Sequence, residues 1–220
     1  SIQTAYDIRN RAAQINHAGS LTSQVFDALG NLTATQDPNG NATGHQYDGL
    51  NRLLQTVDAL SGNTQYGYDK NDKLVQVTAP NGATTGYEMD DLGNLLKEQS
   101  PDRGLLVYTH DEAGNTKTIT DARNVTTQYS YDALNRVTQM DYPGTEEDVA
   151  LTYDTYTGCT NGTGRLCKVT DQSGTTEYAY DGFGNVTETR KTERGVTYIT
   201  RYTHDTLNRV GDERPVEAIQ

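Results

Sequence analysis

The chain has 220 residues, an apolar fraction of 33%, no tryptophan and a formal net charge of −12 at pH 7. This acidic balance argues against nucleic acid and anionic membrane surfaces as partners, because both favour basic protein surfaces. No run of the sequence approaches the ~20 apolar residues of a membrane span. A composition this polar leans toward disorder, so the evidence for an ordered fold must come from a pattern in the sequence.

A Tyr-Asp dipeptide, or a near variant of it, recurs about every 21 residues and opens a turn each time. Successive spacings are 20, then 21 five times, then 22, 27 and 24, so the register is strict in the middle and looser toward the C-terminus. Such a fixed period indicates an array in which each unit buries its apolar face against its neighbours. The motif aspartates are Asp7, Asp27, Asp48, Asp69, Asp90, Asp111, Asp132, Asp154, Asp181 and Asp205.

Each repeat predicts a strand, the motif turn, a second strand and a second turn. Ahead of the motif, bulky residues lie two positions apart, as Tyr66 and Tyr68 do, and this spacing puts both on one face of a strand. In the motif turn the carboxylate can accept hydrogen bonds from backbone amides, and Gly or Asn tolerates a positive φ at the exit. A β-prone run follows, such as residues 53–57 or 74–78, and leads to the next turn. The motif tyrosine is replaced by bulky side chains, which indicates a conserved shape rather than a conserved functional group: Phe26, Met89, His110 and His204.

The predicted fold class is all-β, with tandem antiparallel β-hairpin repeats forming a long curved strip. No segment shows a helical apolar stripe, so no substantial helix is expected. A flat strip would expose edges that aggregate, so it should curl, close or be capped. We expect one array of about ten units over residues 1–220, with an irregular insertion near 155–166. Both ends of the sequence look cut, which suggests a fragment of a larger protein.

Two cysteines, Cys159 and Cys167, bracket the insertion that stretches one spacing to 27. If they lie opposite each other across a widened hairpin, they can form a local disulfide in an oxidising compartment. Two free buried thiols remain the alternative.

The recurring acids predict structural turns rather than chemistry. No calcium-loop spacing, paired glycosidase carboxylates, metal-binding histidine pattern or phosphate loop is present, so we expect no catalytic residue, metal or cofactor. The string Asp37-Pro38-Asn39-Gly40 reads as an ordinary turn, because Pro pre-sets φ at its second position. The predicted turn residues are Asp27, Asp48, Asp69, Asp90, Asp111, Asp132, Asp181 and Asp205.

From Tyr6 to about Val210, the motif Tyr-Asp-x-x-Gly/Asn-Asn/Arg-Leu resembles the YD (Rhs) repeat family. That family includes bacterial Rhs polymorphic toxins, the B and C components of Tc toxins, cell-wall-associated toxins and the animal teneurins. The resemblance implies a β-strip that spirals into a hollow shell enclosing a toxic C-terminal domain. Rhs shells end in an autoproteolytic Asp-Pro-x-Gly core, which the string at Asp37 matches only superficially, since it lies early in the array.

The resemblance therefore implies a structural wall without enzymatic activity, in an effector made in the bacterial cytoplasm and then secreted. Its implied partners are its own C-terminal toxin domain, the remaining shell repeats and, for type VI delivery, secretion-system tip proteins. The alternative is a cell-surface or carbohydrate-binding module of a teneurin-like or wall-associated protein, with exposed tyrosine rows stacking on sugars. A glycosidase or a self-cleaving aspartyl protease at Asp37 is a third hypothesis.

Overall fold

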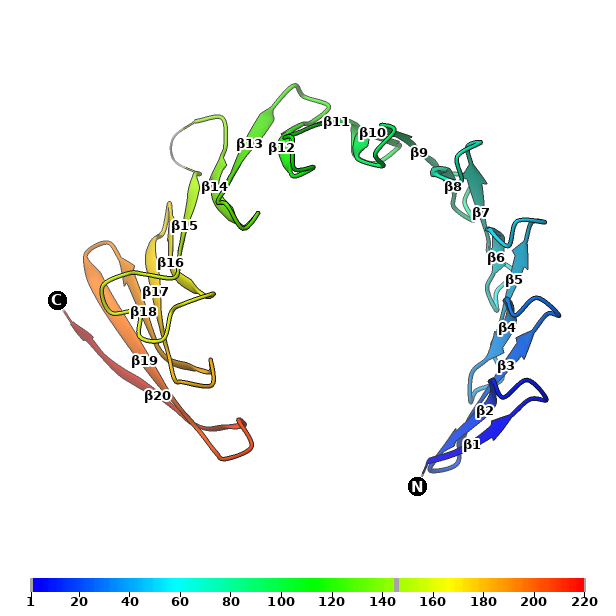
Figure 1. Ribbon diagram of the computed structural model, residues 1–220, viewed down its shortest axis with the longest axis horizontal. Helices are drawn as coiled ribbons and strands as arrows, with labels where there is room; N and C mark the ends of the chain where they lie inside the picture. The colour runs from blue at the N-terminus through cyan, green and yellow to red at the C-terminus, as the bar shows by residue number, and fades with distance from the viewer. Residues whose placement is uncertain (1, 145–146, 220) are drawn as a thin grey trace. The chain divides into compact units, whose positions relative to one another are not determined.

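The computed structural model describes residues 2–144 and 147–219, and the side chains of these residues up to 211. All regular secondary structure in this part of the chain is β-strand, which confirms the predicted all-β class of tandem antiparallel hairpins (Figure 1). The chain divides into two compact units, Ser1–Val107 and Tyr108–Gln220, and each is described by itself. Within the described residues, no helix is long and apolar enough to cross a membrane.

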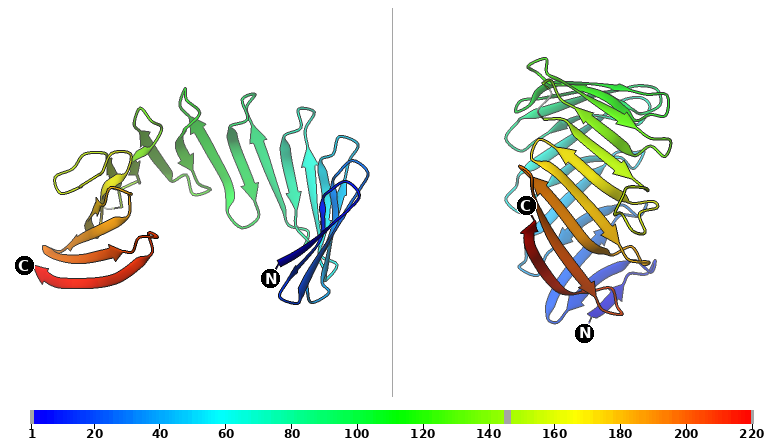
Figure 2. Two further views of the ribbon diagram at one scale, coloured as in Figure 1. Left: turned by 60° about the horizontal axis from the view of Figure 1, so that its bottom comes forward. Right: turned by 90° about the vertical axis from the view of Figure 1, so that its left-hand side faces the viewer.

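The first unit is an antiparallel meander in which consecutive strands from β1 (Ile2–Tyr6) to β11 (Gly104–His110) pair with one another (Figure 2). Its last strand begins in this unit and runs on into the second. The strands are β1 (Ile2–Tyr6), β2 (Ala12–His17), β3 (Ser20–Phe26), β4 (Leu32–Gln36), β5 (Ala42–Tyr47), β6 (Leu53–Val57), β7 (Asn63–Tyr68), β8 (Leu74–Thr78), β9 (Thr84–Met89), β10 (Leu95–Ser100) and β11 (Gly104–His110).

The second unit continues the same pattern of consecutive antiparallel pairs. The strands are β12 (Thr116–Thr120), β13 (Thr126–Tyr131), β14 (Val137–Asp141), β15 (Val149–Tyr153), β16 (Leu166–Asp171), β17 (Gly174–Tyr180), β18 (Val186–Glu193), β19 (Val196–His204) and β20 (Val210–Ile219). The strands β18 and β19 lie between Asp181 and Asp205 and are longer than the strands of the earlier repeats, which accounts for the final spacing of 24 residues.

The motif turn between β5 and β6 shows why the sequence reverses at each Tyr-Asp. The amide of Asp48 donates to the carbonyl of Arg52 at 2.9 Å, and the amide of Asn51 donates to the carbonyl of Asp48 at 3.0 Å. Asn51 takes a left-handed backbone with φ of 64°, a conformation that Asn and Gly adopt most readily. Asp37 opens a turn of the same hydrogen-bond pattern at the opposite end of the hairpins, between β4 and β5.

Each motif turn is preceded by a shift in the pairing register, at the last residue of the incoming strand. At this shift one residue of the outgoing strand has no direct partner, which is a β-bulge, and bulges bend a strand and increase its twist. The bulge therefore introduces local curvature once per repeat. The shifts fall at Ala5/Tyr6, Val25/Phe26, Gln46/Tyr47, Gly67/Tyr68, Glu88/Met89, Ser130/Tyr131, Thr152/Tyr153, Ala179/Tyr180 and Thr203/His204.

One face of each hairpin is more apolar than the other, but few side chains on either face are fully buried. Tyr66 lies opposite Val77 and both are half-buried, whereas the neighbouring Gln76 is exposed. Among the described side chains, the only fully buried apolar ones are Leu106, Cys167 and Ile199. With so small a core, the joints between successive repeats must supply much of the order of the array.

Candidate functional site: the joints between repeats

Backbone pairing between consecutive repeats stops before it reaches the motif turns. Between β6 and β7 the paired residues are Gln55 with Gln65, Thr56 with Thr64, and Val57 with Asn63. The halves of these strands nearest the motif turns have no ladder pairs across the joint, although they stay paired within their own hairpins. The same termination occurs between β4 and β5 and between β12 and β13. Side chains must therefore close each joint at this end.

The motif tyrosine makes the first of these closing contacts. The hydroxyl of Tyr68 donates to the carbonyl of Leu53 at 2.9 Å, and that of Tyr131 donates to the carbonyl of Thr116 at 2.7 Å. In each case the acceptor is the first residue of the outgoing strand of the preceding repeat. Tyr47 and Tyr180 make the same contact, to Leu32 and Leu166, at 3.0 and 2.6 Å.

This contact qualifies the prediction that the motif slot conserves only a shape. At four joints the phenol hydroxyl satisfies a backbone carbonyl that the ladder leaves unpaired, and such a group is costly to leave without a partner. Burial raises the pKa of Tyr131 and of Tyr180, so both hydroxyls stay protonated donors at neutral pH. His110 occupies the same slot, and its Nδ1 is buried without a hydrogen-bond partner among the described residues.

The last residue of most motif turns makes the second closing contact. Arg52 forms an ion pair with Asp48 of its own turn at 2.7 Å and with Asp72 of the next turn at 2.7 Å. Its guanidinium also lies over the ring of Tyr68, 4.9 Å from the ring centre. One side chain thus ties the turn of one repeat to the turn and the tyrosine of the next.

Asparagine performs the same linking role without charge. Asn31 Nδ2 donates to Asp27 at 2.8 Å within its own turn and to Asn51 Oδ1 of the next turn at 2.9 Å. Asn115 repeats this arrangement with Asp111 and Asn135, at 3.0 and 2.8 Å. Lys73 reaches the carbonyl of Asp90 in the following turn. The contact is thus retained while the side chain that makes it changes.

The motif carboxylates hold the turns from within. Each of the eight predicted turn aspartates accepts at least one backbone amide of its own turn, at 2.7 to 3.0 Å. Where the turn ends in Arg, as for Asp132, the amide of Arg136 contributes most to lowering the carboxyl pKa. Where it ends in Asn, as for Asp111, the Asn115 side-chain amide contributes most. The ionised carboxylate is therefore the form that stabilises the turn.

Asp37 belongs to this structural class as well. Its Oδ1 accepts the amides of Asn39 and Asn41, each at 2.9 Å, and Oδ2 accepts Asn41 Nδ2 at 2.8 Å. These bonds occupy the carboxylate in holding its own turn. In the part of the chain that the structure describes, no three His, Cys, Asp or Glu side chains gather to hold a metal ion.

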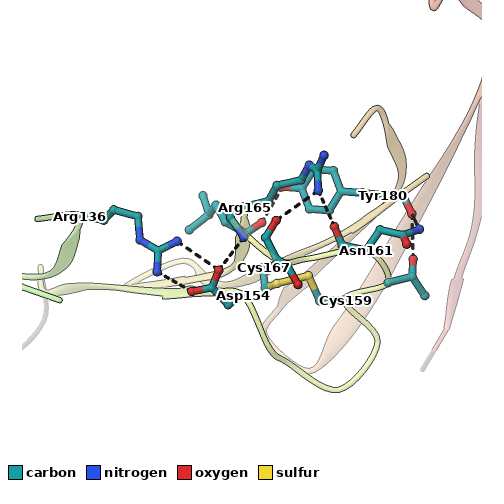
Figure 3. Close-up of a disulfide and its surroundings, with 11 residues drawn as sticks. Arg136, Asp154, Cys159, Asn161, Arg165, Cys167 and Tyr180 are labelled. Atoms are coloured by element: carbon teal, nitrogen blue, oxygen red, sulfur yellow. Dashed lines mark hydrogen bonds and ion pairs between the residues drawn. A yellow bond between two sulfur atoms is a disulfide. The ribbon is translucent and has the colours of Figure 1, made fainter. Parts of the chain in front are cut away.

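The two cysteines are joined in the structure, with their sulfur atoms 2.02 Å apart (Figure 3). The inserted residues 155–164 lie inside the motif turn that Asp154 opens and Arg165 closes, since the amide of Asp154 donates to the carbonyl of Arg165 at 3.0 Å. Arg165 takes the place of Arg52, with its guanidinium 5.7 Å from the ring centre of Tyr180. Asp154 is instead held by Arg136 of the preceding repeat at 2.5 Å, and this contact contributes most to lowering its pKa.

Sequence reasoning identified the turn acids and the two cysteines but missed the linking residue that ends most of the turns. A signal was present: the position four after the motif aspartate carries Arg, Lys or Asn in nine of the ten repeats. In the remaining repeat, the one that begins at Asp154, the insertion displaces the corresponding arginine along the sequence to Arg165. Long hydrogen-bonding side chains at a fixed position beside a charged turn residue indicate a contact that extends beyond the turn.

The fold and its joints define a structural repeat array built from linked β-hairpins. The chain belongs to the teneurin YD-shell family, whose model matches residues 1–211. This places it in the YD-repeat family that the motif predicts.

Solved structures share the fold at low sequence identity. The crystal structure of TcdB2-TccC3 matches with a TM-score of 0.71 and 15% identity, over 98% of this chain and 15% of that chain. The crystal structure of TcdB2-TccC3-TEV matches with a TM-score of 0.50 and 12% identity, over 95% of this chain and 17% of that chain. This chain therefore spans only about a sixth of the length of the structures it resembles. Among curated proteins, none matches the chain significantly.

Proposed function

We propose that this chain is a segment of the wall of a hollow YD shell, and that the shell encloses a C-terminal toxin domain of a secreted bacterial effector. Membership of the YD-shell family supports the structural role. The observation that carries the proposal is the recurring joint, in which Tyr, Arg or Asn side chains connect one hairpin to the next. A wall of this kind extends by adding repeats and needs no central core.

The proposed partners are the toxin domain and the other repeats of the same shell, with secretion-system tip proteins at delivery. The proposed site of action is outside the producing bacterium. The shared fold with TcdB2-TccC3 supports a toxin-related shell, and the acidic surface is consistent with a wall that does not bind nucleic acid.

A carbohydrate-binding module remains the alternative proposal, and the tyrosines favour the wall. Sugar binding by this chain would require exposed rings with free hydroxyls. Four motif tyrosines instead donate their hydroxyls to backbone carbonyls. Among the described tyrosines only Tyr6 and Tyr198 are strongly exposed, at 59% and 49%, and they lie in separate units.

Limited proteolysis of the full-length protein tests the enclosure. The expected result is that the C-terminal domain survives in the native protein and is digested when the wall is opened. Gly174→Val should open the wall, because even a Cβ at this position would lie 1.9 Å from the carbonyl oxygen of Thr192. Tyr180→Phe is a milder second variant, and Leu50→Ser, in an exposed turn, is the control. Equal digestion rates of the C-terminal domain in the native protein and both wall variants would contradict the proposal.

A further inference from the structure

The stapled repeat is the one whose motif turn, from Asp154 to Arg165, holds the Cys159–Cys167 disulfide, and a plain joint is one without such an inserted loop. The joint between the stapled repeat and the one after it carries contacts that the other described joints lack. The tip of the inserted loop docks on Tyr180, at the end of β17. The amide of Tyr180 donates to the carbonyl of Thr160 at 3.1 Å, and the carbonyl of Tyr180 accepts Thr160 Oγ1 at 3.1 Å and Asn161 Nδ2 at 2.9 Å. Figure 3 shows Asn161 and Tyr180 facing each other across this contact.

The ordinary joint contacts are also present here. Tyr180 still donates its hydroxyl to Leu166, and Arg165 still lies over its ring. The loop therefore adds three hydrogen bonds to a joint that already has the usual two contacts. At Tyr68, the corresponding residue of a plain joint, no described loop contacts the backbone.

The disulfide is placed so that it controls the docking of the loop. Cys159 directly precedes Thr160, the residue that contacts Tyr180 twice, whereas Cys167 lies fully buried within β16. The bond therefore ties the docking tip to the sheet. Gly162 is buried against both sulfur atoms, and a Cβ there would lie 2.4 Å from Cys159 Sγ and 2.5 Å from Cys167 Sγ.

The base of the loop is held independently of the disulfide. Asp154 accepts the amide of Gly164 at 2.6 Å, and the amide of Asp154 donates to the carbonyl of Arg165 at 3.0 Å. In the tip, Arg165 Nη1 also donates to the carbonyl of Asn161 at 2.9 Å, whereas Thr160 follows directly on Cys159. The ion pair between Asp154 and Arg136 does not involve either sulfur atom. Breaking the disulfide should release Thr160 from Tyr180 and leave the turn itself closed.

We propose that the Cys159–Cys167 disulfide is a reducible latch, which holds the loop on Tyr180 in oxidising surroundings and releases it to a dithiol reductant. This makes one joint of the array sensitive to redox conditions while the plain joints stay insensitive. The inference concerns the joint alone and does not depend on what a shell encloses.

The exchange proceeds at the more accessible sulfur. Cys159 is partly exposed and lines a shallow surface hollow with Thr155, Tyr156 and Thr157, whereas Cys167 is inaccessible. A reductant thiolate attacks Cys159 Sγ, the sulfur–sulfur bond breaks, and Cys167 leaves as a thiolate that takes up a proton. The second reductant thiolate then displaces Cys159, which is also protonated. The protein gains two electrons and two protons, and the reductant becomes a disulfide.

Site-resolved hydrogen exchange of the chain, with and without dithiothreitol, tests the latch. Reduction should speed exchange of the Tyr180 amide on the order of tens-fold, the effect expected from opening a closed loop of about eight residues. The Tyr68 amide should exchange at an unchanged rate. In a Cys159→Ala/Cys167→Ala double variant, the Tyr180 amide should exchange quickly with or without the reductant.

Three results would overturn the proposal. One is unchanged exchange at Tyr180 after thiol titration shows that both cysteines are reduced. Another is equal acceleration at Tyr180 and Tyr68, which would indicate general loosening. The third is a disulfide that resists dithiothreitol while the protein remains folded.

Discussion

The plain turn from Asp48 to Arg52 and the stapled turn from Asp154 to Arg165 share the contacts of their first and last residues but differ in length. In both, the amide of the first residue donates to the carbonyl of the last, at 2.9 and 3.0 Å. In both, the closing arginine lies over the tyrosine of the next repeat, at 4.9 and 5.7 Å from the ring centre. The plain turn closes four positions after its aspartate and the stapled turn eleven. The array therefore constrains the two ends of a turn and tolerates a change in its length.

The two turns differ in how their carboxylates are held. Asp48 is bonded by two amides of its own turn and by Arg52. Asp154 keeps only the amide of Gly164 from its own turn and depends on Arg136 of the preceding repeat. The insertion thus exchanges contacts within a turn for contacts between repeats, and the disulfide fixes the added loop.

Acid should produce the broadest effect, because it acts on every turn at once. The folded-state pKa values of Asp48, Asp132 and Asp154 all lie below the ordinary value of 3.8. The stabilisation is therefore complete above about pH 4 and is lost as the pH falls through the lowered folded pKa values, since protonation removes the acceptor. Hydrogen-exchange opening energies measured at decreasing pH should be flat near neutrality and fall below pH 3.8. Opening energies that stay constant in strong acid would contradict this account.

The glycine against the disulfide should give the largest effect of any single substitution within these two turns. Gly162→Ala places a methyl group into both sulfur atoms and within 2.8 Å of the carbonyl oxygen of Asp154. Overpacking of this kind costs about 1–3 kcal/mol. The matched control is Gly182→Ala, in the next motif turn, where a Cβ would meet no atom within 4 Å. The local opening free energy near the stapled turn should fall only in the first variant, and equal values in both would contradict the prediction.

The tyrosine hydroxyl should contribute at joints where it has an acceptor and not elsewhere. Tyr131→Phe leaves the carbonyl of Thr116 without its donor and should cost about 1 kcal/mol of local stability. Tyr153 occupies the same slot one repeat later, and its hydroxyl has no described partner, so Tyr153→Phe should be nearly neutral. Native-state hydrogen exchange across the two joints measures both costs. If the two variants behave alike, the hydroxyl contact does not close the joint.

The apolar turn tips should contribute least. Leu50 and Leu134 each lie two residues after a motif aspartate and are 67% and 70% exposed. Replacing either leucine with Ser should change the local opening free energy by no more than about 0.5 kcal/mol, because an exposed side chain buries little area. A loss above about 1 kcal/mol would show that these tips pack against something in the folded protein.

The sequence predicts the repeating parts of this molecule well and the contacts between them poorly. Strand, turn and register follow from period, alternation and turn chemistry, each of which is local. The bulge at residues such as Tyr68 does not follow. It depends on which residues of the two strands face each other, and sequence spacing alone does not specify that pairing. The second role of Arg52 was missed for a related reason: its partners Asp72 and Tyr68 lie in the next repeat.

The stapled turn shows the same limit. The cysteines and the insertion are visible in the sequence, and so is the prediction that they can join. The docking of Thr160 and Asn161 on Tyr180 is not visible, because it uses backbone groups that only the terminated ladder leaves free. Groups left free by an interrupted ladder can be located only after the strands have been paired.

Electron microscopy of the full-length protein is the most direct test of the wall. The account predicts that residues 1–220 form a continuous part of a closed β-wall, with density for a C-terminal domain inside it. A C-terminal domain resolved outside the wall, or repeats that enclose no volume, would contradict the account.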